Sequence, residues 1–365
     1  MANTGRRKDA EEIDLFPILD GDRPSRGLVK MTEAAETAGS GHLVEYRALS
    51  PKSILNRSIS KRRLSLAYSI NPYRGCEFGC RYCYARYTHE FMVTPNSPEG
   101  ESTALQSYDA FERRIFLKKN AAWLLEQELR YIDRRDEIAL GTATDPYQPL
   151  ERREEVTRSL LEVFARKEGY RLGIVTKSQL ILRDRDLLAK IAERNTLVVH
   201  CTITTTDAEL ARKLEPRAPR PDLRFEAVRG LREAGIRTGV LCSPLLPGIT
   251  DMEASVDRVA RRAKQADASF LAGEPLFLKS CSRPTYLSFV REHFPALEAE
   301  YANRFAHAEF ASTSYRLAMA ELMSRVCARY GIPERSTDAL LTRDAGGKPP
   351  MSSAPASSDQ QLLFG

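Results

Sequence analysis

Six short hydrophobic stretches recur along the chain, and segments with a helical spacing of apolar residues separate them. The stretches are rich in Val, Ile, Leu and Ala and do not alternate strictly with polar residues. This pattern is typical of strands that are buried on both faces of a parallel sheet. We therefore expect strands over residues 64–71, 137–142, 171–177, 197–204, 237–246 and 268–277.

The segments between these strands predict amphipathic helices, over residues 121–132, 152–167, 184–194, 207–215, 221–235 and 252–266. Strand–helix units in series predict a parallel sheet with right-handed crossovers. About 40 residues per unit suits an α/β barrel, and six units rather than eight predict a partial, TIM-like (β/α)6 barrel. A doubly wound open sheet is the alternative, because periodicity alone does not separate the two.

Composition divides the chain into four segments. Residues 1–45 mix charges, Gly and Pro without sustained periodicity, and we expect a mobile N-terminal arm there. We expect residues 46–300 to form the barrel and residues 301–344 to form a C-terminal helical extension. Residues 345–365 begin with a stretch rich in Gly, Pro, Ser and Ala, which predicts a flexible tail.

Composition also narrows the class of protein. Hydrophobic residues make up 42% of the 365 residues, which excludes a wholly disordered chain. Seven cysteines are too few for a secreted disulfide scaffold. The sequence contains no membrane-spanning run and no secretory signal, so we expect a cytoplasmic protein. The net charge of +6 permits an anionic partner without requiring one, since both signs are interspersed.

Three cysteines follow the first predicted strand with the spacing Cys76-x3-Cys80-x2-Cys83, and Gly75 and Gly79 allow the loop to curl tightly. In a reducing compartment such a group is typical of a metal or iron–sulfur site. A closed site needs four protein ligands, so three cysteines on a cubane leave one iron open for a substrate or cofactor. A zinc site with His89 as the fourth ligand is the alternative.

With the aromatic Tyr82 before its last cysteine, the motif resembles that of the radical S-adenosylmethionine (SAM) superfamily. The resemblance implies a partial barrel of the radical SAM type and a [4Fe–4S] cluster on the three cysteines. It implies that the open iron chelates SAM, whose reductive cleavage yields a 5′-deoxyadenosyl radical that abstracts hydrogen from a substrate. It also implies an electron donor such as flavodoxin or ferredoxin, and a cofactor contact for Tyr82.

Polar residues after the later strands are further candidates for contacts with SAM. By the same resemblance, Thr144 and Asp145 are expected to hold the methionyl amine, or else to form a turn that caps the next helix. Lys177 is expected to bind the carboxylate, or else to be a solvated strand-end lysine. Thr204 is expected to meet the ribose or sulfonium region, or else to belong to a segment that serves strand propensity and caps the following helix.

Five segments in order resemble a narrower group, the radical SAM proteins related to spore photoproduct lyase and grouped as DNA-photolyase-like. They read NPYRGCEFGCRYCYAR, TDPYQPLE, VTKSQLILRD, LEPRAPRP and PLLPGITD. This resemblance implies a lyase-like or DNA-repair-like enzyme that acts on nucleic acid. The lyase relatives use a cysteine hydrogen donor near the second strand, but residues 141–149 contain no cysteine, so the hydrogen donor stays unassigned. Radical modification of a peptide or small molecule, or a non-catalytic metal-stabilised binding module, are the alternatives.

Other residues suggest secondary roles. Cys201 and Cys242 are expected to be buried. Cys281 lies in a polar loop, from which it either faces the mouth of the active site as a radical donor or has no such role. The basic groups at 61–63 and at Arg217, Arg220 and Arg224 either bind phosphate or form solvated helix faces. Tyr84 and Tyr147 either stack on a base or pack internally.

The last residues contain Gln360, Leu363 and Phe364 in the order Gln-Gln-Leu-Leu-Phe. This segment resembles the short peptide by which bacterial polymerases and repair proteins bind the replication sliding clamp. The resemblance implies that Gln360 contacts the rim of the clamp pocket and that Leu363 and Phe364 fill it. A tail that folds back onto its own barrel, or a chance match, is the alternative.

Overall fold

The computed structural model describes residues 36–40, 44–57, 66–90, 92 and 109–335, and its larger sheet contains the six predicted parallel strands. They are β4 (Leu66–Ile70), β7 (Glu137–Leu140), β8 (Arg171–Thr176), β9 (Thr196–Thr202), β10 (Arg237–Leu241) and β11 (Leu271–Ala272). The antiparallel β3 (Leu55–Arg57) lies at the outer edge of β4.

The order of the strands distinguishes the two expected architectures. The sheet runs β11-β10-β9-β8-β7-β4-β3, so the parallel strands follow one another in chain order without a reversal. A doubly wound sheet reverses its order at a switch point. The partial barrel is therefore confirmed, with β3 and β11 as edges of a sheet that does not close.

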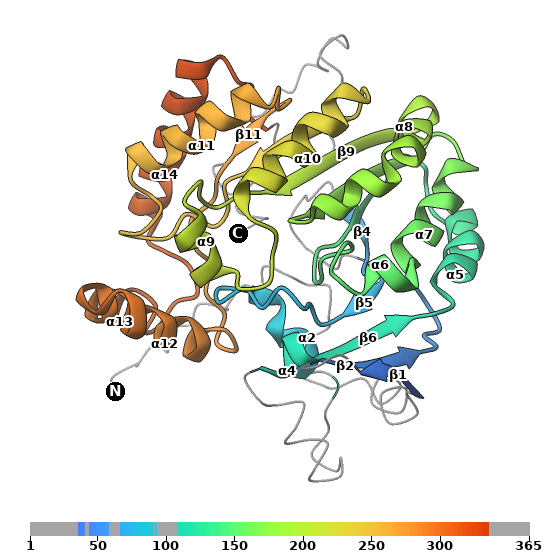
Figure 1. The fold of residues 1–365 in the computed structure, drawn as a ribbon, viewed down its shortest axis with the longest axis horizontal. Coiled ribbons are helices and arrows are strands. Elements are labelled where there is room, and N and C mark those ends of the chain that lie inside the picture. The colour runs from blue at the N-terminus through green and yellow to red at the C-terminus, as the bar shows by residue number, and fades with distance from the viewer. Residues whose placement is uncertain (1–35, 41–43, 58–65, 91, 93–108, 336–365) are drawn as a thin grey trace, which may run out of the picture.

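Helices α5 (Ala121–Glu128), α7 (Val156–Ala165), α8 (Arg185–Arg194), α10 (Pro221–Glu233) and α11 (Glu253–Gln265) lie outside the curved sheet (Figure 1). The helix expected over 152–167 is divided into α6 (Glu151–Glu154) and α7. Glu155, at φ +50°, separates them in the left-handed region. The Glu151 carboxylate accepts from the Thr157 and Arg158 backbone N–H groups and so stabilises the start of α7.

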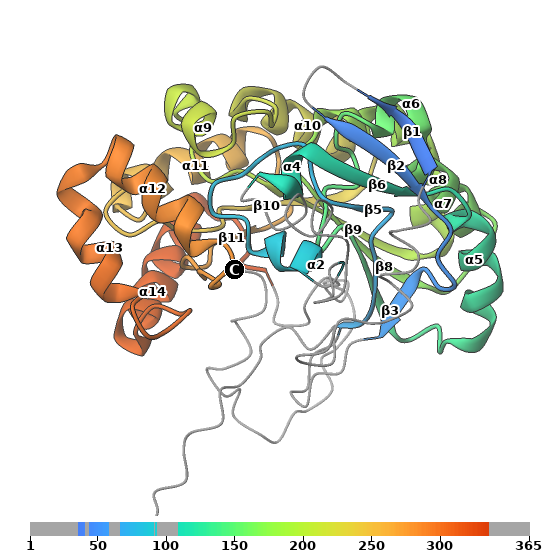
Figure 2. The same cartoon turned by 90° about the horizontal axis from the view of Figure 1, so that it is seen from below.

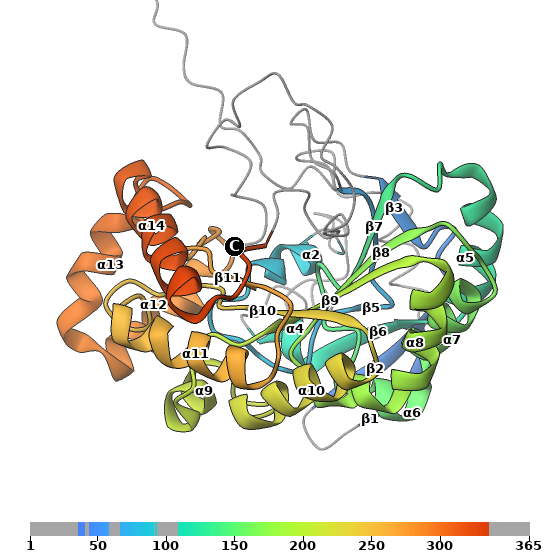
Figure 3. The same ribbon diagram turned by 90° about the horizontal axis from the view of Figure 1, so that it is seen from above.

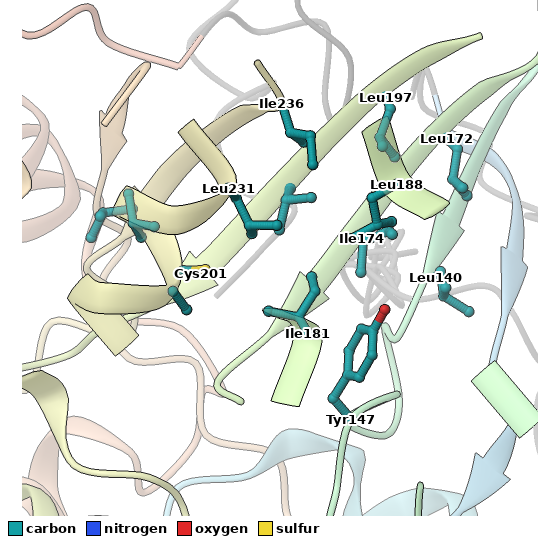
Figure 4. Packing of buried hydrophobic residues seen from close by; sticks show 14 of the residues in the cluster. Leu140, Tyr147, Leu172, Ile174, Ile181, Leu188, Leu197, Cys201, Leu231 and Ile236 are labelled. Carbon is teal, nitrogen blue, oxygen red and sulfur yellow. The ribbon is translucent and has the colours of Figure 1, made fainter. Parts of the chain in front are cut away.

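Both faces of the parallel strands are buried, as the sequence predicts. On the helix side, Leu140, Leu172, Ile174, Leu197 and Cys201 pack against the surrounding helices (Figure 4). On the opposite side, a smaller cluster fills the inside of the barrel and consists of Ala139, Val198, Leu241 and Phe270. Alternate residues of each strand thus reach different clusters, which follows from the two-residue period of a strand.

A second sheet, which the hydrophobic pattern does not predict, contains β1 (Glu36–Ser40), β2 (Glu45–Leu49), β6 (Arg114–Lys118) and β5 (Tyr73–Arg74) in that order. Short helices α2 (Tyr87–Glu90) and α4 (Ala110–Arg113) and the 3-10 turn η1 (Tyr84–Arg86) accompany it. Figure 2 shows this sheet on one side of the molecule and α12–α14 on the other. Because β5 lies between β4 and the cysteine loop, the sheet fixes where that loop begins.

The C-terminal helices α12 (Arg283–His293), α13 (Glu298–Arg304) and α14 (Thr313–Tyr330) gather at the β11 end of the sheet, where α14 packs on α11 (Figure 3). The expected division at residue 300 falls inside α13. Helix α9 (Ala208–Leu214) follows β9, and the turns η2 (Leu129–Tyr131), η3 (Gln179–Asp184) and η4 (Pro295–Leu297) complete the described elements.

Candidate active site

A cavity lies beyond the C-terminal ends of β7, β8 and β10, the edge at which α/β barrels carry their chemistry. Cys76, Cys80 and Cys83 all line it, and all three are free thiols. Residues from the later strands complete the wall and include the segment 141–145, Val175, Thr176, Lys177, Thr202, Leu241 and Phe277. The structure therefore brings the cysteine triplet together with the loops that follow the other strands.

Close backbone contacts hold the cysteine loop. Gly75 has φ +79°, and a Cβ there would lie 2.7 Å from the Phe111 carbonyl oxygen, so only glycine fits. Next to it, the Cys76 N–H donates to that same carbonyl at 2.9 Å. On the other side of the loop, the Arg81 N–H donates to the Leu214 carbonyl at 2.9 Å. The loop is thus held between the small sheet and the end of α9.

Thr144 lines the cavity, and its hydroxyl donates to the Gly75 carbonyl at 2.6 Å. The fully buried Gln148 amide reinforces this link, because it donates to the Thr144 hydroxyl and accepts from the Glu77 N–H at 3.0 Å. The Glu77 carboxylate in turn accepts from the Leu150 N–H at 2.8 Å. The segment after β7 therefore supports the cysteine loop, a role for Gln148 and Glu77 that sequence reasoning missed.

Asp145 also lines the cavity, but three donors already occupy its carboxylate. These donors are the Thr176 hydroxyl at 2.7 Å, the Lys177 N–H at 2.7 Å and the Tyr147 N–H at 2.9 Å. Burial raises the pKa of Asp145, and these hydrogen bonds oppose that rise. Asp145 thus joins the ends of β7 and β8 and shapes the cavity wall.

Lys177 is partly buried at the end of β8, with its ammonium 5.8 Å from the centroid of the Tyr82 ring. Burial alone would lower the pKa of Lys177, but the nearby Cys80, Glu215 and Asp145 groups raise it further than burial lowers it. The side chain therefore stays a cation. A cation on the cavity wall is placed to receive a carboxylate.

Tyr82 is anchored by a buried network that the sequence did not predict. Its hydroxyl donates to the Glu215 carboxylate, which forms an ion pair with Arg224. Burial alone would raise the pKa of Glu215, but Arg224 and Lys177 lower it by more, so the carboxylate stays ionised. Arg224 has 2% of its surface exposed and donates to the Thr202 and Pro219 carbonyls. Both expectations for it, a phosphate contact and a solvated helix face, are therefore wrong.

Thr204 lies behind Tyr82 and is outside the cavity lining given by the structure. Its hydroxyl oxygen lies 3.2 Å from the Tyr82 hydroxyl oxygen, and it donates to the Ser243 carbonyl at 3.2 Å. Thr202, two residues earlier on β9, lines the cavity instead. Thr204 therefore supports Tyr82 rather than facing the cavity.

The opposite wall comes from β10, the segment after β11 and the end of the cysteine loop. Ser243 and Pro244, joined by a cis peptide bond, and Phe277 line the cavity there. Beside them, burial raises the pKa of Glu274 to about 7, although Arg335 and Arg316 oppose the rise. The Glu274 N–H donates to the Ser243 hydroxyl oxygen at 3.0 Å, so this carboxyl group, which sequence reasoning missed, belongs to a segment that adjoins the site.

The remaining candidates are placed as follows. Cys201 in β9 and Cys242, which directly follows β10, are both buried, as predicted. Cys281 is partly buried, with its sulfur 3.9 Å from the Tyr84 carbonyl oxygen, and so lies next to the cysteine loop. Tyr147 has 1% of its surface exposed and packs in the core, whereas Tyr84 lines the cavity. The basic group at 61–63 and the tail at 345–365 lie outside the described residues.

The donor set fits a cluster better than a zinc ion. Within the described ranges, no three His, Cys, Asp or Glu side chains converge tightly enough to hold one metal ion. A cubane instead receives each thiolate on a different iron, so the sulfurs must face one cavity but need not converge on a single point. His89, the proposed fourth zinc ligand, interacts with the Arg114 carbonyl oxygen at 3.0 Å and packs on Phe111 and Phe116. It is not among the residues that line the cavity.

Comparison with known proteins agrees with this geometry. The family model described as the radical SAM superfamily matches residues 70–260. The chain belongs to the radical SAM superfamily. An uncharacterized protein of Mycobacterium tuberculosis is 30% identical over 328 residues, which cover 88% of this chain and 92% of that protein. An uncharacterized protein of Methanocaldococcus jannaschii is 30% identical over 186 residues, 51% of this chain and 63% of its own length.

Solved structures show the same radical SAM fold. Spore photoproduct lyase complexed with dinucleoside spore photoproduct matches with a TM-score of 0.53 at 14% identity, over 78% of this chain and 79% of that chain. A mutant of the lyase with bound AdoMet and dinucleoside spore photoproduct matches with a TM-score of 0.52 at 15% identity, over the same shares. At this level of identity the likeness concerns the fold.

Membership of the superfamily identifies the cofactors as a [4Fe–4S] cluster and SAM. Burial is the largest cause of the rise in the pKa of Cys80 to about 12, and Lys177 acts against that rise. Metal coordination reverses such a shift, because a coordinating thiol is deprotonated outright. None of the helices in the described ranges combines the length and apolar composition of a bilayer-spanning helix.

Proposed function

We propose that this radical SAM enzyme cleaves SAM reductively at a [4Fe–4S] cluster held by Cys76, Cys80 and Cys83, and that it acts on nucleic acid in a lyase-like or repair-like reaction. When bound, the cluster and SAM supply an electron and an adenosyl group for radical chemistry. The observation that carries the proposal is that three free thiols share one cavity with a cationic Lys177 at the C-terminal ends of the strands.

The residues around the cavity have separate roles in this proposal. Lys177 receives the carboxylate of SAM as a point charge. Tyr82 contacts the cofactor through its ring, which Glu215 and Thr204 hold in place. Thr144 and Asp145 position the loop that faces the methionyl amine, because their polar atoms are already bound to Gly75, Thr176 and the Lys177 backbone.

A second cleft beside the cavity favours an anionic polymer as the substrate. Phe78 lines both, and Arg152 and Arg217 line the cleft. Among the residues that the structure describes, neither arginine pairs with a carboxylate. Apolar side chains that line the same cleft, such as Leu180 and Leu223, offer a surface for a sugar or base. Spore photoproduct lyase, which shares the fold, is complexed with a dinucleoside spore photoproduct, and this ligand supports a nucleic-acid component as the substrate.

The decisive experiment is anaerobic reconstitution of the full chain with iron and sulfide, followed by reduction in the presence of SAM. We expect four irons per chain and 5′-deoxyadenosine, with turnover stimulated by ultraviolet-irradiated DNA more than by native DNA. Stimulation by a peptide or metabolite fraction instead would transfer the same chemistry to the alternative substrate class. One zinc per chain without SAM cleavage would contradict the enzyme proposal.

The cleft has its own test. Each phosphate contact that is lost reduces the salt dependence of DNA binding by about one unit of slope. Arg152→Gln with Arg217→Gln should therefore weaken DNA binding and flatten its salt dependence. Arg130→Gln is the matched control, because Arg130 is exposed and lies in η2, before β7 and thus toward the opposite edge of the sheet. Equal binding by the double variant and the control would contradict the cleft as a DNA site.

We also propose that Gln360, Leu363 and Phe364 tether the enzyme to a bacterial sliding clamp. The support is the order of these residues in the sequence. Two apolar anchors in a linear peptide suit affinities of about 1 μM, near −8 kcal/mol. A labelled peptide of residues 351–365 should bind the clamp saturably, and a peptide with Leu363→Ala and Phe364→Ala should not. Equal binding by both peptides would contradict the tether.

The segment boundaries, the cellular location and the electron donor are further proposals. We propose that the boundaries near residues 45, 300 and 344 separate the barrel from an N-terminal arm, a helical extension and a tail. We propose a cytoplasmic location, where flavodoxin or ferredoxin supplies the electron. Limited proteolysis of the full chain tests the boundaries, since cleavage should concentrate near residues 45 and 344.

A further inference from the structure

A separate small cavity lies behind the cysteine loop, between the larger sheet and the small one. Ala143 lines both this cavity and the one that holds the cysteines, so the two adjoin. The other lining residues are Asn56, Asn71, Tyr73, Arg74, Tyr87, Thr88 and Lys118. Two of these, Arg74 and Lys118, are cations that no step of the proposed reaction uses.

Strand pairing places the two cations on one face. Arg74 of β5 pairs with Phe116 of β6, and Lys118 follows Phe116 by two residues. Residues directly opposite on antiparallel strands share a face, and so do residues two apart on one strand. Arg74 and Lys118 are therefore diagonal neighbours, held by the backbone hydrogen bond from the Lys118 N–H to the Pro72 carbonyl at 3.2 Å.

Neither cation has a counter-ion among the residues that the structure describes. Lys118 has 5% of its surface exposed, and no hydrogen bond or ion pair reaches its ammonium or the Arg74 guanidinium there. The acidic group that acts on Lys118 is Glu128, whose carboxylate is occupied by the Ile54 and Leu55 N–H groups and the Ser53 hydroxyl. Lys118 is buried and Arg74 is partly buried, and two such adjacent charges without a partner are unfavourable unless an anion joins them.

The other polar groups of the cavity are already committed. The Asn71 carbonyl oxygen accepts from the Ala143 N–H at 2.8 Å, and the Asn56 amide donates to the Ser69 carbonyl at 3.2 Å. Thr88 donates its hydroxyl hydrogen to the Ala85 carbonyl at 2.8 Å. The charged donors that line the cavity are those of Arg74 and Lys118, and they select an acceptor with negative charge.

Size and charge narrow the class of anion. The cavity has a volume of about 30 Å³, roughly twice what one water needs by this measure, so it admits an oxyanion but not a nucleobase. A guanidinium and an ammonium together carry two positive charges, which match a phosphate group better than a single carboxylate. Burial and the neighbouring Arg74 lower the pKa of Lys118 to about 7, a shift that a bound anion would reverse.

We propose that Arg74 and Lys118 form a phosphate-binding site in the cavity that adjoins the cysteine-lined one across Ala143. The site does not depend on the proposed reaction or on DNA as the substrate. Its occupant is either free phosphate or the phosphate of a nucleotide that reaches into the neighbouring cavity. Both sources use the same two donors.

Equilibrium dialysis of the full chain without its cofactors against radiolabelled inorganic phosphate tests the site. We expect saturable binding of one phosphate, weakened about tenfold or more in Lys118→Met, because loss of a charge-assisted hydrogen bond has that effect. Lys119→Met is the matched control, since Lys119 is the next residue on the chain and is exposed. It should bind phosphate within about twofold of the wild type.

A measurement of unfolding free energy, with and without phosphate, tests the site even if a variant folds poorly. Without phosphate, Lys118→Met should be at least as stable as the wild type, because it removes an unpaired buried charge, and phosphate should then stabilise only the wild type. A 5′-phosphorylated dinucleotide and its unphosphorylated form distinguish the two sources, since only a nucleotide source predicts tighter binding than phosphate itself. Equal binding by the wild type and Lys118→Met, or no saturable binding by the wild type, would overturn the proposal.

Discussion

The Tyr82 hydroxyl donates a hydrogen bond to the Glu215 carboxylate at the end of α9, although 132 residues lie between them in the chain. The same carboxylate pairs with Arg224, and both partners have 2% of their side-chain surface exposed. The aromatic residue of the cysteine motif is thus fixed by an ion pair in the core. A change to this ion pair should therefore alter the position of the Tyr82 ring, which lies beside Lys177.

The first prediction separates the two parts of this network. Glu215→Gln should destabilise the protein by about 3–5 kcal/mol, because it leaves the Arg224 charge buried without a counter-ion. Tyr82→Phe should cost only about 1 kcal/mol, because the ion pair survives the loss of one hydrogen bond. Chemical denaturation of the two variants without cofactors measures the difference. A larger loss for Tyr82→Phe than for Glu215→Gln would contradict the arrangement.

The second prediction concerns the cluster. Cys76→Ala, Cys80→Ala or Cys83→Ala should remove most of the iron and abolish 5′-deoxyadenosine formation, because three thiolates are the minimum that holds the cubane. Cys201→Ala is the control, since that thiol is buried on the helix side of β9, outside the cavity lining. Iron content and product analysis decide the matter. Full iron and turnover in Cys80→Ala would refute the assignment.

The third prediction concerns SAM binding. Lys177→Met should weaken SAM about ten- to hundredfold, or 1.5–3 kcal/mol, with the cluster retained, because a charge-assisted contact is lost. Asp145→Asn should weaken SAM and also reduce stability, since Asp145 accepts three hydrogen bonds that join β7 to β8. Lys264→Met, an exposed change on α11, is the control. Unchanged SAM affinity in both site variants would remove these roles.

The fourth prediction concerns pH and the small cavity. Burial lowers the pKa of Lys118 to about 7; of the charged groups that act on it, Arg74 lowers the pKa further and Glu128 raises it. Sulfate stays doubly charged between about pH 6 and 8, so its binding there reports the protein alone. Sulfate affinity should fall as pH rises through this range, because Lys118 loses its proton. Isothermal titration at three pH values checks this, and a flat profile would contradict it.

The fifth prediction concerns Glu274, whose folded-state pKa is raised to about 7. A carboxyl group with a raised pKa favours the folded state while protonated, and this contribution is lost as pH rises from the unfolded pKa through the folded one. Glu274→Gln removes that loss, so its stability relative to the wild type should increase from pH 5 to 8. The gain should reach about 3 kcal/mol, at 1.36 kcal/mol for each pKa unit. A constant difference measured by denaturation across this range would disprove it.

Local patterns were sufficient for the elements of the barrel. The six parallel strands lie within or within one residue of their predicted ranges, because strands buried on both faces leave continuous apolar runs in the sequence. The cysteine loop was recognisable for a similar reason, since its three thiols and two glycines lie within nine positions, 75–83. The strands and the cysteine loop depend mainly on residues that are close together in the chain, so the sequence is sufficient to predict them.

Long-range pairing decided what local patterns could not predict. Glu215 and Arg224 look like surface charges in the sequence, and only the fold buries them together beneath Tyr82. Likewise, Arg74 and Lys118 become neighbours because β5 and β6 pair although more than 35 residues separate them. No periodic pattern in the sequence indicates which strands pair. The strength of a charge–charge interaction depends on how far the charges are buried, because burial lowers the effective dielectric constant around them. The tertiary structure decides that burial, so only it shows what these charged residues do.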